Sequence, residues 1–66
     1  MNPSDWEELA GLTARLDELR SQLEAAEAGS KIATIYALEE AIAEAEATRE
    51  QVLSRLHDRL VEETAA

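Results

Sequence analysis

The chain has 66 residues, a net charge of −9 from 15 acidic and 6 basic residues, and no cysteine. A chain of this length forms one small domain with a modest core, so it needs a further source of stability. The lack of cysteine excludes disulfides and thiolate metal sites, and a single histidine excludes a multi-histidine site within one chain. Self-association is the source of stability that remains.

The negative charge narrows the classes of partner. It disfavours direct binding of nucleic acid, because such binding depends on Lys and Arg neutralising phosphates, and it disfavours anionic membranes. The charge suits a basic protein partner, imitation of nucleic acid, or solubility alone. No apolar run approaches the roughly 20 residues that span a bilayer, and the N-terminal residues lack the basic-then-apolar order of a signal peptide. We therefore expect a cytoplasmic protein without a membrane partner.

The first expected helix covers about residues 4–28. Strong helix formers, including 13 alanines and 9 leucines, dominate the whole chain. Two N-terminal caps fit: Asn2 followed by Pro3 at the first helical position, or Ser4 with Glu7 in a capping box. One stripe of this helix is apolar, because its members recur every three or four residues: Leu9, Leu12, Leu16, Leu19, Leu23 and Ala26.

A single turn is expected at residues 28–30. Gly29 suits the left-handed position that follows a helix, and Ser30 can then cap the next helix. So short a connection forces the two helices to lie antiparallel.

The second expected helix covers about residues 31–63 and extends past the first at Leu60 and Val61. Its main stripe is interrupted by Arg49. The other members of this stripe are Ile35, Leu38, Ile42, Ala45, Leu53, Leu56 and Leu60, with Val52 as an alternative to Leu53. A second apolar edge lies about 100° round the helix: Ile32, Tyr36, Ala43 and Val61. Because a helix with two apolar edges needs two neighbours, the sequence predicts an all-α hairpin, residues 1–66 as one domain, that dimerises into a four-helix bundle.

Three features are candidate interaction sites. Arg49 is expected either to pair with an acid of the first helix, Glu8 in the first place or else Asp5, or to contact another chain, since arginine is enriched at interfaces. Trp6 and Tyr36 suit either core and dimer packing or anchoring of a partner. A run of four carboxylates forms either a solvated face or a docking surface for a basic protein: Glu39, Glu40, Glu44 and Glu46.

The sequence does not favour an enzyme. The serines have no histidine–carboxylate arrangement typical of nucleophilic catalysis. His57 and Asp58 are adjacent, and such neighbours do not face each other on a helix, so we expect His57 at the edge of the core or in an interface. The Glu-x-x-His motif of di-iron bundles is absent, since Ser54 stands three residues before His57. We expect no catalytic residue, cofactor or metal.

Length and layout resemble those of Rop-type proteins, helical hairpins that pair into four-helix bundles. The resemblance implies a fold and no function, because those proteins can bind RNA through a basic face that this chain lacks. We expect a protein-binding module, a small acidic regulator or inhibitor of phage-encoded or accessory type that docks on a larger protein. The alternatives are a purely structural oligomerisation unit and an acidic mimic of nucleic acid. The expected partner-binding residues are Trp6, Tyr36, Glu40, Glu44 and Arg49; the expected core or dimer residues are the leucines and isoleucines of the two stripes.

Overall fold

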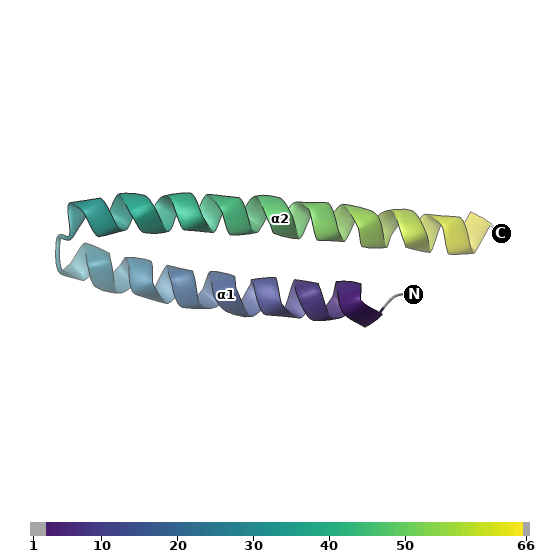
Figure 1. Cartoon of the computed structure of the whole chain (residues 1–66), viewed down its shortest axis with the longest axis horizontal. Coiled ribbons are helices and arrows are strands. Elements are labelled where there is room, and N and C mark those ends of the chain that lie inside the picture. Colours follow the sequence, from purple (N-terminus) through teal and green to yellow (C-terminus); the bar gives the residue numbers. More distant parts are fainter. Residues whose placement is uncertain (1–2, 66) are drawn as a thin grey trace.

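The computed structural model describes residues 3–65, which form two antiparallel helices joined by a short loop (Figure 1). Helix α1 spans Pro3–Ala28 and helix α2 spans Ile32–Ala65. The helices pack against each other along their length, as expected of a hairpin. Within the described residues, neither helix has a stretch of the length and hydropathy needed to cross a bilayer.

The start of α1 decides between the two expected caps. The helix begins at Pro3, so Ser4 already lies inside it and is not the N-cap. Proline at the first helical position fits the other alternative, whose cap, Asn2, lies outside the described residues. Gly11 is exposed within α1, and a Cβ added there would meet no atom within 4 Å. This glycine weakens the helix by its propensity alone.

Two backbone hydrogen bonds close the C-terminus of α1. The Lys31 amide donates to the Ala26 carbonyl at 3.0 Å, and the Ser30 amide donates to the Glu27 carbonyl at 3.1 Å. This pair of bonds is a Schellman motif, and its left-handed residue is Ser30, with a φ of 54°. The expectation that Gly29 takes this position is wrong, because neither glycine of the chain has a positive φ.

The same loop sets the start of α2. The Ile35 amide donates to the Lys31 carbonyl at 2.9 Å, which makes Lys31 the N-cap residue. The expectation that Ser30 caps this helix is wrong, because Ser30 is used to end α1. The second helix therefore begins at Ile32, one residue later than expected.

The core is a thin seam between the helices. Leu16 and Val52 are its most buried side chains, at 2 % and 0 % exposure. Val52, and not Leu53, is therefore the residue that continues the stripe inward after Arg49. The buried apolar residues are Leu16, Leu19, Ala26, Ala45, Val52 and Leu56.

Most of the expected core or dimer residues are only partly covered by the hairpin. Those buried are Leu16, Leu19 and Leu56; those half-buried are Leu9, Leu12, Leu23, Ile35, Leu38, Ile42 and Leu53. Leu60 is 44 % exposed. A single hairpin therefore uses only part of the apolar surface of its two stripes.

The hairpin is long and thin, with Cα extents of 54 × 15 × 12 Å. Helix α2 has 34 residues against 26 in α1, and its last turns extend past the start of α1 (Figure 1). Near this end of α2, Leu60 and Val61 are 44 % and 50 % exposed.

Candidate interaction surface

One side of α2 carries four aliphatic side chains, Ile35, Ile42, Leu53 and Leu60, which we call the aliphatic row. Their spacing of 7, 11 and 7 residues returns to nearly the same angle on a helix of 3.6 residues per turn. The first three are half-buried and Leu60 is exposed. Helix α1 covers the row from one side only, so the rest of each side chain is open to water or to another chain.

An ion pair marks the side of the hairpin on which the aliphatic row lies. Arg20 Nη2 lies 3.1 Å from Glu46 Oε1, and both side chains are about half exposed, at 53 % and 49 %. Glu46 follows Ile42 by four residues, so the two share a face of α2. On α1, Arg20 likewise follows Leu16 by four residues. This side therefore combines aliphatic side chains with an exposed charge pair.

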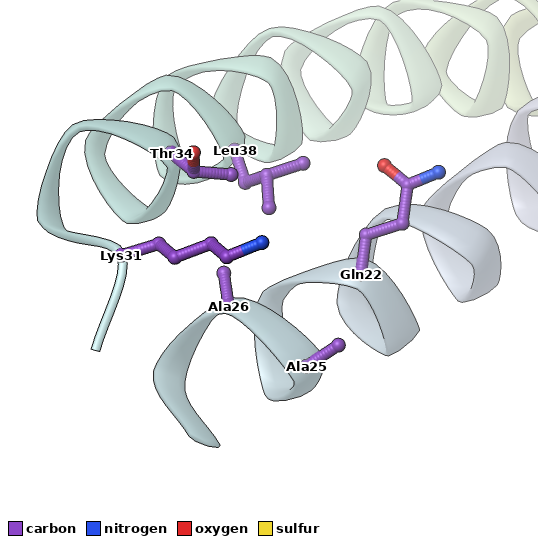
Figure 2. A pocket seen from close by; sticks show the side chains of 6 residues that line it. All are labelled: Gln22, Ala25, Ala26, Lys31, Thr34 and Leu38. Atoms are coloured by element: carbon purple, nitrogen blue, oxygen red, sulfur yellow. The ribbon is translucent and has the colours of Figure 1, made fainter. Parts of the chain in front are cut away.

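The opposite side of the hairpin has two shallow hollows. The first, of about 270 Å³ beside the loop, is lined by Gln22, Ala25, Ala26, Lys31, Thr34 and Leu38. Figure 2 shows the Lys31 side chain extending from the loop into it. The second, of about 220 Å³, is lined by Leu12, Arg15, Ala41, Glu44, Ala45 and Thr48. Alanine and threonine form much of both linings, so this side offers a partner less apolar surface than the aliphatic row.

The sequence spacing explains why the two sides differ. Thr34 and Ala41 precede Ile35 and Ile42 by one residue each, which turns them about 100° round α2. The small side chains therefore lie on one flank of the seam and the aliphatic row lies on the other.

The open end of the hairpin holds a cluster of four charged side chains that the sequence reasoning missed. Arg59 Nη1 lies 3.0 Å from Asp5 Oδ2, and Arg55 Nη2 lies 3.0 Å from Glu8 Oε2 and 3.9 Å from Asp5 Oδ1. The Asp5 side chain is only 11 % exposed. Its Oδ2 lacks hydrogen-bond geometry to any described residue, so its contact with Arg59 is an ion pair. The sequence does contain a sign of this cluster. Asp5 and Glu8 are three residues apart and Arg55 and Arg59 are four apart, and residues at these spacings share a helix face.

The prediction that Arg49 pairs with Glu8 or Asp5 is wrong. Glu8 pairs with Arg55, and Asp5 pairs with Arg55 and Arg59. Arg55 lies six residues beyond Arg49, or about 9 Å along the helix axis, and so is nearer to the start of α1. Arg49 is half-buried and forms no ion pair with any of residues 3–65.

The five expected partner-binding residues do not form one site. Tyr36, Glu40 and Glu44 follow one another at intervals of four on α2 and are exposed, Tyr36 at 67 %. Arg49 lies about 140° round the helix from Glu44. Trp6, 46 % exposed, lies near the start of α1 at Pro3, whereas Tyr36 lies near the start of α2 beside the loop. The structure groups three of the five and separates the other two.

His57 does not belong to the edge of the hairpin core. Its Nδ1 lies 3.9 Å from Asp58 Oδ1, and both side chains are about three-quarters exposed, at 75 % and 76 %. Within residues 3–65, no three histidine, aspartate or glutamate side chains are grouped so that they could hold a metal ion.

No protein-family model, curated protein or solved structure matches this chain. The resemblance to Rop-type hairpins therefore remains one of length and layout.

Proposed function

We propose that this chain is a non-enzymatic protein–protein interaction module that works as a homodimer, with its two hairpins packed into a four-helix bundle. The observation that carries the proposal is the aliphatic row, which α1 covers on one side only. The fully buried core of one hairpin is small, and small domains commonly gain stability by oligomerising. A second hairpin on this side would complete the cover of the row.

The accessible surface supports the same proposal. It measures 4766 Å², whereas a compact protein of this mass exposes roughly 4,200 Å². The excess of roughly 600 Å² approaches the roughly 800 Å² that each partner buries in a standard interface. The radius of gyration, 15.6 Å, likewise exceeds the roughly 11 Å of a compact chain of this length.

We further propose that this dimer is a small, cytoplasmic acidic regulator or inhibitor that docks on a larger, basic protein. Tyr36 supports this second contact, because an exposed tyrosine is typical of interface anchors, and Glu40 and Glu44 on the same face would steer a basic partner. Tyr36 follows Ile35 directly, so it points about 100° away from the aliphatic row. A dimer formed through the row would leave Tyr36 accessible.

The dimer is tested by sedimentation equilibrium at micromolar concentration. We expect a mass of two chains, and a single species near 7.3 kDa would contradict the proposal. Leu60→Glu should weaken the dimer strongly, because it places a charge in the aliphatic row. The matched control is Val61→Glu, a neighbour of similar exposure that lies outside the row and should change the dimer little.

The docking surface is tested by capture from a cell lysate with two variants that keep the helical circular dichroism spectrum. The first combines Tyr36→Ala, Glu40→Lys and Glu44→Lys; the second changes Glu18, Gln22 and Ala25 on the back of α1. We expect the first variant, and not the second, to lose the protein that the native chain captures. Capture of nothing by the native chain would favour a purely structural unit, and capture abolished by moderate salt alone would favour a nucleic-acid mimic.

A further inference from the structure

The aliphatic row is symmetric about its centre, and the two charged residues beside that centre have opposite signs. Their positions pair across a point between residues 47 and 48: Ile35 with Leu60, Ile42 with Leu53, and Glu46 with Arg49. The row thus has aliphatic residues toward both ends, and an acid and a base on either side of its centre. Such a surface is complementary to a second copy of itself rotated by 180°.

We propose that a second copy of this chain packs antiparallel against α2 on this side, so that Arg49 of each protomer pairs with the partner's Glu46. The inference rests on the homodimer proposed above and specifies its interface. Ile35 then contacts the partner's Leu60, and Ile42 contacts the partner's Leu53. Arg49 gains the counter-charge that residues 3–65 of its own chain do not provide.

The distribution of charge favours this orientation over a parallel one. In the antiparallel dimer, each Arg49 lies opposite the partner's Glu46. Parallel pairing would instead place Arg49 against the partner's Arg49 and Glu46 against the partner's Glu46, and like charges in contact oppose association.

The length of α2 fits the same arrangement. The helix spans Ile32–Ala65, so its midpoint lies between residues 48 and 49, within about one residue of the symmetry point. Two antiparallel copies therefore overlap along nearly their whole length. Leu60, which is exposed in the hairpin, then lies against the loop end of the partner's α2.

Disulfide trapping separates the antiparallel dimer from the alternatives. Because the native chain has no cysteine, Ile35→Cys and Leu60→Cys can each be introduced as the only thiol. In an antiparallel dimer two copies of the same residue lie 25 positions apart, or roughly 37 Å, far beyond the Cα separation a disulfide allows. We expect mild oxidation to link a mixture of the two variants into covalent dimers and to link neither variant alone.

The possible outcomes distinguish a failure of the antiparallel interface from a failure of the proposed homodimer. Covalent homodimers of Leu60→Cys would overturn the antiparallel arrangement and leave the proposed homodimer intact. A dimer by sedimentation that yields no covalent product from the mixture would place the interface elsewhere and overturn the inference alone. A monomeric native chain would overturn both.

A charge exchange gives a second test on the same pair. Arg49→Glu should raise the dimer dissociation constant about tenfold or more, because it faces the partner's Glu46 with a like charge. Adding Glu46→Arg to the same chain should restore part of the affinity, because it recreates the opposite charges across the interface but also removes the Arg20–Glu46 pair within each hairpin. Arg15→Glu is the control with the same change of net charge, since Arg15 lines a hollow on the opposite side. A double variant no tighter than Arg49→Glu alone, or an equal loss in Arg15→Glu, would contradict the pairing.

Discussion

At the scale of single residues, the loop contains a strained position. Ser30 has a φ of 54°, a conformation that costs a residue with a Cβ roughly 1–2 kcal/mol and that glycine adopts freely. Ser30→Gly should therefore raise the free energy of unfolding by about 1 kcal/mol, measured by urea denaturation at a fixed chain concentration. The control is Ser21→Gly, exposed within α1, which should lower the stability because glycine disfavours the helix.

Replacing the neighbouring Gly29 with alanine should stabilise the fold, whereas the same change at a glycine with a positive φ would destabilise it. Its φ is not positive, and a Cβ added to it would have its nearest neighbours at 3.6 Å, ordinary van der Waals contact. Gly29→Ala should therefore stabilise the fold by roughly 0.4–1 kcal/mol, chiefly by restricting the unfolded chain. A loss of stability in this variant would mean that Gly29, and not Ser30, occupies the left-handed position.

The buried seam should be sensitive at Leu16. This side chain is 2 % exposed within the cluster it forms with Leu19 and Ala45, so Leu16→Ala should cost roughly 2–5 kcal/mol. Ala47 is exposed on α2, and Ala47→Ser should be nearly neutral. Thermal unfolding of the two variants at equal concentration makes the comparison, and similar losses in both would contradict the placement of Leu16 in the core.

At the scale of the helices, the sequence predicted the two elements and the single break because these depend on local signals. Apolar spacing of three and four residues gives the helices, and glycine beside serine gives the turn. Which of Gly29 and Ser30 becomes left-handed is not local, because that choice shifts the direction in which α2 leaves the loop. The helix–helix packing therefore decides it.

The charged contacts were less predictable for a related reason. With 15 acidic residues in the chain, each arginine has several acids within reach, and the axial register set by the loop selects among them. An antiparallel register centred on the turn predicts Glu8 or Asp5 as the partner of Arg49, whereas Arg55 lies closer to both acids along the axis. The interruption of the stripe likewise left Val52 and Leu53 as alternatives, and the structure buries Val52 fully and Leu53 in part.

The ion-pair cluster at the open end should hold the start of α1 against α2. Asp5 is the central member, because it is largely buried and lies close to both Arg55 and Arg59. Asp5→Ala should lower the free energy of unfolding by about 1–3 kcal/mol, as expected for the loss of a partly buried charge contact. The matched control is Asp17→Ala, an exposed aspartate in the middle of α1, for which we expect no loss. Chemical denaturation followed by circular dichroism measures both, and equal losses would remove the structural role of the cluster.

At the scale of the whole molecule, two opposing electrostatic effects act on the proposed dimer. Each chain carries a net charge of −9, so two chains repel each other over long distances. The two pairs between Arg49 and the partner's Glu46 attract, but half-exposed ion pairs contribute only about 0.2–1 kcal/mol each. The apolar contacts of the aliphatic row do not depend on charge. Long-range repulsion should therefore govern the response to salt.

Raising the salt concentration should strengthen the dimer. The Debye length falls from about 30 Å at 0.01 M to about 8 Å at 0.15 M ionic strength, much shorter than the 54 Å length of the hairpin, so most of the repulsion between chains is screened. Sedimentation equilibrium across this range should give a dissociation constant that decreases with salt, whereas docking on a basic protein should weaken over the same range. The sign of the salt effect thus separates self-association from binding of a basic partner in one titration. A dimer that dissociates as salt rises would mean that charge contacts, rather than the aliphatic row, hold the two hairpins together.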